Sequence, residues 1–293
     1  MRSRALRRAI PRPLKRGLAW LAGWAYWSRR RLRRVIGRGA GAQAQGDRQT
    51  AGSEPPSGAP LDLPLDAPDS IVARNEHGVY CVPRSSQHRP VAQAVLQSRV
   101  WEAETLDLVR GADSDGDIVH AGTFFGDFVP ALARSRANGA IVWAFEPGDE
   151  NHRCSEITTA LNGLENVVLT HAGLGAEGGT ALLATGDREG LPLGGASRII
   201  SDPARARWWD NEEVKLVALD EVLGGDRRVA AVQLDVEGHE LQALAGALRT
   251  IERCRPLIVL ETLPEAEWIE EHLSPLGYRV DGTVNRNFVL RCS

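Results

Sequence analysis

The chain has 293 residues, 43% of them hydrophobic, which suits one globular domain of about 200 to 250 residues and an extension. Residues 1–38 hold 13 basic and no acidic residues, and residues 39–70 hold one basic and five acidic residues. Residues 71–293 hold 21 basic and 33 acidic residues. This acidic body argues against a nucleic-acid-binding core, because phosphate binding requires clustered Lys and Arg.

Residues 1–38 form a basic amphipathic tail. Its apolar run at 17–27 is shorter than the roughly 20 residues that span a bilayer, and arginines follow it where a signal peptide would have its cleavage site. Three interpretations stay open: a helix in peripheral contact with the inner membrane surface, a solvated tail, or an arm for a nucleic acid or another partner. Residues 39–70, rich in Gly, Ala, Pro and Ser, are predicted to be a disordered linker.

The four cysteines are Cys81, Cys154, Cys254 and Cys292, and no two form a C-x-x-C pair. The sequence therefore predicts neither a metal site nor a disulfide framework. Reduced thiols are typical of a cytoplasmic protein, which is the expected location.

Ordered structure is expected from residue 71 onward. A strand at 78–82 and helical material at 91–110 come first, and Trp101, Glu102 and Glu104 there either cap the cofactor pocket or start a helix. Core strands are predicted at 117–121, 140–145, 166–170, 229–234 and 256–260, with helices between them. Short strands at 179–184, 196–201 and 214–217 indicate an insertion at the sheet edge or over the site, and 278–280 with 288–290 form a terminal antiparallel pair. This order predicts an α/β fold: a mostly parallel sheet with helices on both faces and a C-terminal hairpin.

The stretch 117–126, DIVHAGTFFG, joins the first core strand to a helix through a glycine turn. Glycines at 122 and 126 let the backbone approach a ligand, and the helix start offers free N–H groups, as in nucleotide cradles. Glu146 ends the second core strand, twenty residues after Gly126. A carboxylate in that place accepts hydrogen bonds from a ribose diol, so the spacing favours a nucleotide-type cofactor.

Three blocks together resemble the FkbM-type methyltransferases over about residues 78–291: IVHAGTFFGDF at 118–128, AFEP with LNGLENVVLTHAGLG within 144–175, and QLDVEG at 233–238 before a Leu-rich helix and RPLIVLE. The resemblance implies that residues 71–293 are a methyltransferase domain with a Rossmann-like fold and a seven-stranded sheet. It also implies S-adenosyl-L-methionine as the cofactor.

The resemblance further implies the cofactor contacts. Residues 121–126 would wrap the methionine end, Glu146 would take the ribose hydroxyls, and the turn at 171–173 would lie near the adenine. The implied cofactor-binding residues are His120, Ala121, Gly122, Thr123, Phe124, Gly126, Glu146, His171 and Ala172. His120 stands where the family usually has aspartate, and Phe124 where it often has asparagine. Either the contact with the cofactor's ammonium group is weaker in this chain than in the family, or Asp127 or Glu102 replaces the missing aspartate. His120 itself is either a ligand contact or a buried imidazole whose hydrogen bonds are satisfied by the protein.

Three residues near the end of the fourth core strand are the catalytic candidates: Asp235, Glu237 and His239. Asp235 ends a buried apolar strand, where an acid requires a partner. Glu237 is either a site residue or an ordinary acid at a helix start. His239 is either the general base for a hydroxyl acceptor or a solvent-exposed helix residue.

The resemblance implies an S-adenosylmethionine-dependent methyltransferase of the EC 2.1.1 class that methylates a hydroxyl of a sugar, glycan or specialised metabolite. The expected partner is a small-molecule or glycan acceptor and not a nucleic acid. Two alternatives stay open. A nicotinamide-dependent oxidoreductase also uses a strand, a glycine turn and a distant acid, but the turn GTFFG lacks the G-x-G-x-x-G of that class. The other alternative is a non-catalytic cofactor-binding module on the same fold.

Overall fold

The computed structural model describes residues 63–64, 67–137 and 139–293. They belong to one unit of the chain, Pro60–Ser293. The interpretations of the basic tail 1–38 and of most of the linker 39–70 therefore lie outside the described residues. Within the described part, no helix is both long enough and apolar enough to cross a membrane.

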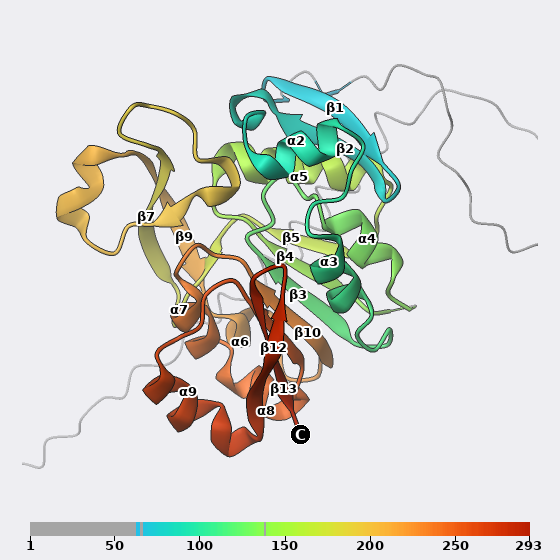
Figure 1. The fold of residues 1–293 in the computed structure, drawn as a ribbon, viewed down its shortest axis with the longest axis vertical. Coiled ribbons are helices and arrows are strands. Elements are labelled where there is room, and N and C mark those ends of the chain that lie inside the picture. Colours follow the sequence, from blue (N-terminus) through green and yellow to red (C-terminus); the bar gives the residue numbers. More distant parts are fainter. Residues whose placement is uncertain (1–62, 65–66, 138) are drawn as a thin grey trace, which may run out of the picture. The chain divides into compact units, whose positions relative to one another are not determined.

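A seven-stranded sheet forms the centre of the unit, in the order β12-β13-β11-β10-β3-β4-β5 (Figure 1). The strands from β11 to β5 run parallel, whereas β13 is antiparallel to both β11 and β12. The predicted sheet and its terminal hairpin are confirmed. The strands are β3 (Asp117–Ala121), β4 (Val142–Phe145), β5 (Val167–Thr170), β10 (Val229–Leu234), β11 (Leu257–Leu260), β12 (Tyr278–Val284) and β13 (Asn287–Cys292).

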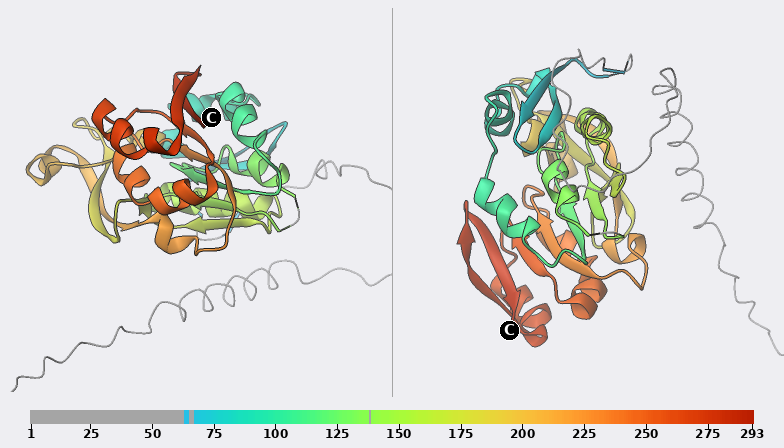
Figure 2. Two further views of the ribbon diagram at one scale, coloured as in Figure 1. Left: turned by 90° about the horizontal axis from the view of Figure 1, so that it is seen from below. Right: turned by 90° about the vertical axis from the view of Figure 1, so that its right-hand side faces the viewer.

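Helices cover both faces of this sheet (Figure 1, Figure 2). On one face, α3 (Ala103–Arg110) and α4 (Val129–Arg134) bury Leu106 and Leu132 against Ile118 of β3. On the other face lie α6 (Leu219–Val222), α7 (Glu240–Ala245), α8 (Leu248–Cys254) and α9 (Ala266–His272), followed by the short turn η4 (Ser274–Leu276). Because both faces are covered, β3 is buried along its whole length, as its apolar sequence predicts.

An N-terminal cap precedes the sheet. Strands β1 (Ser70–Asn75) and β2 (Gly78–Pro83) pair as a hairpin, followed by η1 (Arg84–Ser86) and α2 (Pro90–Leu96). Strand β2 packs against α5 (Asp149–Leu161), where the free thiols of Cys81 and Cys154 are 3.7 Å apart. The helical material expected at 91–110 is two helices, because the backbone is left-handed at Ser98 and Glu102 between them.

The insertion between β5 and β10 forms a sheet of its own, in the order β6-β9-β7-β8, which extends to one side of the unit (Figure 1). Its strands are β6 (Gly173–Leu174), β7 (Gly179–Gly186), β8 (Arg198–Ile199) and β9 (Asp210–Val217). Strands β7 and β9 are longer than predicted, because they pair with each other along most of their length. The short helices η2 (Gly194–Ala196) and η3 (Pro203–Trp208) interrupt the insertion, and η2 reaches the carboxyl ends of the central strands.

Candidate active site

Two cavities lie at the carboxyl ends of the central strands. The first has a volume of about 480 Å³ and the second about 940 Å³, both including space open to solvent. Gly122, Gly195 and Asp235 line both cavities and form the wall between them. Open α/β sheets bind their ligands at this edge, beside the point where the strand order reverses, and here β3 and β10 meet at that point.

The glycine turn after β3 is shaped by its contacts with the protein. Gly122 has a φ of +82°, and a Cβ there would lie 1.7 Å from the backbone oxygen of Asp235. Gly126, at φ +84°, lies against Ser155 of α5 and is not in the lining of either cavity. Thr123 is buried, and its hydroxyl donates to the Phe145 carbonyl at 3.1 Å. These glycines thus allow the turn to pack against β10 and α5. From the sequence alone, the same glycines were explained by the close approach of a ligand.

Glu146 connects the end of β4 to the glycine turn and lines the first cavity. One carboxylate oxygen accepts the Phe124 N–H at 2.8 Å, and the other accepts the Gly148 N–H at 2.9 Å. Burial raises the pKa of Glu146 to about 7, although these N–H donors oppose the shift. Glu146 therefore supports the turn and also presents a carboxylate to the cavity.

The remaining cofactor candidates from the sequence divide between lining and non-lining positions. Ala121 lines the first cavity, and so do Gly173 and Leu174 after β5. His171 lies outside that lining: its side chain is 44% exposed, its Nε2 is 3.1 Å from an Asp149 carboxylate oxygen, and its ring stacks on His152. Ala172 is buried but also lies outside the lining.

The three catalytic candidates do not share one cavity. Asp235 lines both, Glu237 lines the second, and His239 lines the first. The Nε2 of His239 is buried without a hydrogen-bond partner, and burial lowers the pKa of this imidazole. The geometry therefore places His239 on the side of the wall away from Glu237.

His120 lies in the second cavity with one ring nitrogen unpaired. The side chain is 3% exposed, stacks on Phe128, and pairs through Nδ1 with the Gln233 side-chain oxygen. Burial lowers the pKa of His120 to about 4, so the ring is neutral at pH 7. Because an amide oxygen can only accept, Nδ1 carries the proton and Nε2 holds a lone pair that no protein group meets.

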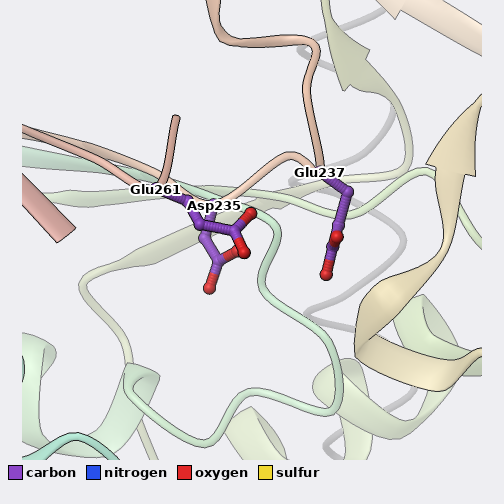
Figure 3. A group of neighbouring side chains, drawn as sticks. All are labelled: Asp235, Glu237 and Glu261. Atoms are coloured by element: carbon purple, nitrogen blue, oxygen red, sulfur yellow. The ribbon is translucent and has the colours of Figure 1, made fainter. Parts of the chain in front are cut away.

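Three carboxylates converge beside His120, from Asp235, Glu237 and Glu261 (Figure 3). One oxygen of each lies within 4.8 Å of an oxygen of the other two. Burial, followed by the repulsion from Glu261, raises the pKa of Asp235 well above its ordinary value and that of Glu237 to about 7. Glu261 is not among the candidates from the sequence, because its proximity to Asp235 depends on the pairing of Leu234 with Leu260.

The rest of the second cavity combines aromatic and charged side chains. Trp101, Phe124 and Phe128 line it, together with the acids Glu102 and Asp127 and two arginines, Arg89 and Arg286. Glu102 also directly precedes the first residue of α3, as the helix-start interpretation predicts, and neither Trp101 nor Glu102 lines the first cavity. The backbone is left-handed at Glu102, Phe124 and Glu237, none of which is glycine, and such conformations concentrate at functional sites.

The family profile of the methyltransferase FkbM domain matches residues 120–280, more than half of the chain and both cavities' core strands. The chain belongs to the FkbM methyltransferase family. This confirms the resemblance, and S-adenosyl-L-methionine is accordingly the cofactor. No curated protein matches the sequence.

Among solved structures, the chain is similar to a methyltransferase FkbM from Methylobacillus flagellatus KT (16% identity, TM-score 0.41, covering 60% of this chain and 43% of that one). It is also similar to the Pyrococcus abyssi tRNA (uracil-54, C5)-methyltransferase in complex with S-adenosyl-L-homocysteine, with 13% identity and a TM-score of 0.37. That match covers 76% of this chain and 43% of that one. A third similar structure is the ribosomal protein L11 methylase of Lactobacillus delbrueckii subsp. bulgaricus, with 12% identity and a TM-score of 0.39. That match covers 69% of this chain and 80% of that one. The chain thus spans less than half the length of the first two, and likeness at this level indicates no substrate.

The first cavity of this FkbM-family chain has the groups that the cofactor requires. Glu146 offers a carboxylate to a ribose diol at the end of β4, and the turn at Ala121 and Gly122 leaves backbone without side chains beside the cavity. The buried, unpaired Nε2 of His239 offers a further polar contact.

Proposed function

We propose that the protein transfers a methyl group from S-adenosyl-L-methionine in the first cavity to a hydroxyl group of an acceptor in the second. The observation that carries this proposal is the wall that the two cavities share at Gly122, Gly195 and Asp235. Displacement at a methyl group requires donor and acceptor in line and in contact. Two cavities that meet at a glycine backbone allow that approach.

The acceptor is proposed to be a small molecule, sugar or glycan rather than a nucleic acid. Five acidic side chains and only two arginines line the second cavity, which therefore lacks the clustered Lys and Arg that a polyphosphate chain requires. Hydroxyl groups, in contrast, donate to carboxylates, and the aromatic rings of Trp101, Phe124 and Phe128 can pack against an apolar ring face.

The bound cofactor supplies a methyl group that is already activated by its sulfonium. The protein then has to orient the acceptor and receive its hydroxyl proton. Neutral His120, whose Nε2 has no hydrogen-bond partner among the described residues, lines the acceptor's cavity together with Asp235 and Glu237, and is the proposed acceptor of that proton. His239 lies in the cofactor's cavity, so its proposed role is contact with the cofactor.

Calorimetric titration of the full chain with S-adenosyl-L-homocysteine tests the first half of the proposal, with NADH as a parallel ligand. We expect saturable binding of the homocysteine adduct, binding that is weaker in Glu146→Gln, and none of NADH. Preference for NADH would instead favour the oxidoreductase alternative.

A screen for methyl transfer tests the acceptor class. Formation of S-adenosyl-L-homocysteine would be followed with sugars, glycosides, hydroxylated metabolites, amines and a transfer RNA as acceptors. We expect turnover with a hydroxyl acceptor and its loss in His120→Ala. Turnover with RNA alone would contradict the proposed acceptor, and cofactor binding without turnover on any acceptor would favour the non-catalytic alternative.

A further inference from the structure

The three converging carboxylates in the second cavity share it with Arg89 and Arg286, and Arg198 and Arg89 oppose the rise in the pKa of Glu237. Among the residues that the structure describes, no lysine or arginine forms an ion pair with Asp235, Glu237 or Glu261. One oxygen of Glu261 is buried and has no hydrogen-bond partner. Partly buried carboxylates that are not ion-paired repel each other and carry a desolvation penalty, so a bound proton or a bound cation would stabilise this arrangement.

The positions of the three acids are fixed by the backbone. Asp235 and Glu261 directly follow the paired strand ends Leu234 and Leu260, so their side chains start from neighbouring strands. Glu237 follows on the loop after β10, where its own left-handed backbone at φ +53° turns it toward the other two (Figure 3). The group is thus built from three rigid points, which makes it unlike acids gathered by chance on a mobile surface.

His120 gives the second, independent indication of a ligand. It belongs to β3, is 3% exposed and lines the cavity that holds the three carboxylates, and its Nε2 has no hydrogen-bond partner among the described residues. With Nδ1 donating to Gln233, Nε2 can only accept a hydrogen bond. A buried acceptor of this kind suits the O–H of a water or hydroxyl group that is held beside it.

We propose that Asp235, Glu237 and Glu261 bind a divalent cation that prefers oxygen ligands, such as Mg²⁺, Mn²⁺ or Ca²⁺. Two oxygens on the same cation of this type are at most about 5 Å apart, and the three carboxylate oxygens here lie within 4.8 Å of one another. The site supplies no cysteine or imidazole to the cation, which disfavours Zn²⁺ and Cu²⁺.

The cation site also sharpens the proposed function, on which this step rests. Three protein oxygens leave several positions of a six-coordinate cation for water or for an oxygen of the acceptor. A hydroxyl oxygen in such a position lies beside Asp235 at the wall between the cavities and within the cavity that His120 lines. A bound cation lowers the pKa of that hydroxyl, which assists its loss of a proton.

Binding of Mn²⁺ to the full chain, freed of metal with a chelator, tests the site through the electron paramagnetic resonance signal of the free ion. We expect about one Mn²⁺ per chain with a dissociation constant below about 1 mM, and competition by Mg²⁺ or Ca²⁺. Glu261→Gln should weaken binding about tenfold or more. The matched control is Glu104→Gln, the same change at an exposed acid bonded to Asn285.

Three outcomes would overturn the cation site: no saturable binding, equal binding in Glu261→Gln and the unchanged chain, or equal loss in Glu104→Gln. The first would mean that the carboxylates share a proton instead. Titration with S-adenosyl-L-homocysteine on the same samples separates the two proposals, because Glu261 lines only the second cavity. Mn²⁺ binding without homocysteine-adduct binding would refute the proposed function and leave the cation site standing.

Discussion

The carboxylates at the two ends of the β3–β10 strand pair differ in their partners. At the amino end, Asp117 is 2% exposed and accepts two bonds from Arg227, at 2.7 and 2.5 Å, one from the Trp143 indole at 2.8 Å and one from the Ile141 N–H at 2.9 Å. At the carboxyl end, Asp235 meets Glu261 and no cation among the described residues. A carboxylate such as Asp117, with all its hydrogen bonds and its counter-charge in place, stabilises the fold. A carboxylate such as Asp235, without a cation, lowers stability but remains able to bind a ligand.

The largest effect is expected from Gly122→Ala, with Gly139→Ala as its counterpart at the amino end. Both glycines have positive φ, +82° and +87°, but only Gly122 has an atom within 1.7 Å of the added Cβ. Gly122→Ala should lower the free energy of unfolding by about 4 kcal/mol, from the left-handed backbone and the displacement of β10. Gly139→Ala should lower it by only about 1 kcal/mol, because nothing lies within 4 Å. Urea unfolding of both variants measures the difference, and equal losses would mean that the turn does not hold the strands together.

The next effect separates the carboxylates themselves. Asp117→Ala should lower the free energy of unfolding by about 3 kcal/mol, because it leaves the Trp143 and Ile141 donors unpaired. Glu261→Gln, measured without added metal, should leave stability unchanged or raise it, because it removes a repulsive charge. The comparison between the two ends fails if both substitutions destabilise the protein to the same extent in urea.

The pH dependence at Glu146 tests the carboxyl end further. Burial raises its pKa from 4.5 to about 7, so the folded chain binds more protons than the unfolded chain between these values. This group's contribution to stability therefore decreases as pH rises from 4.5 to 7. Cofactor binding should follow the opposite trend, since ribose hydroxyls donate to the ionised carboxylate.

We expect affinity for S-adenosyl-L-homocysteine to fall by up to about tenfold per pH unit below pH 7 and to be constant above it. Calorimetry on either side of pH 7 measures the trend. Glu146→Gln cannot titrate and should abolish it. A trend of equal slope in the variant would assign the titration to another group.

The smallest effect is expected at His171, where the resemblance and the geometry differ. The family pattern places this turn near the adenine, whereas the structure pairs the side chain with Asp149 and His152 outside the lining of the first cavity. His171→Ala should change the dissociation constant of S-adenosyl-L-homocysteine by less than about twofold, since exposed pairs contribute little. A loss of tenfold or more would restore the sequence-based role.

The amino-acid sequence determined the fold class and the family. Short, mainly apolar runs such as 117–121 and 229–234 predict buried strands, and their alternation with helices predicts a parallel sheet with both faces covered. Glu146 could be identified because its role follows from local spacing after the glycine turn. These features depend on short segments of chain, so they can be recognised without knowing which strands are neighbours.

Only the tertiary structure decided how the site is divided. The pairing of β10 with β11 brings Glu261 to Asp235 across 26 positions of sequence, and no local pattern encodes that register. On its other side, β10 pairs with β3, which places Gln233 against His120. The contact with Gln233 fixes the tautomer of His120 and leaves its Nε2 free. His239 and Glu237 are two residues apart but face different cavities, because the chain turns sharply between them at Gly238. Side-chain direction after a strand end depends on such turns and on the neighbouring strands, which is why the sequence yields candidate residues but neither their cavities nor the proximity of Glu261 to Asp235.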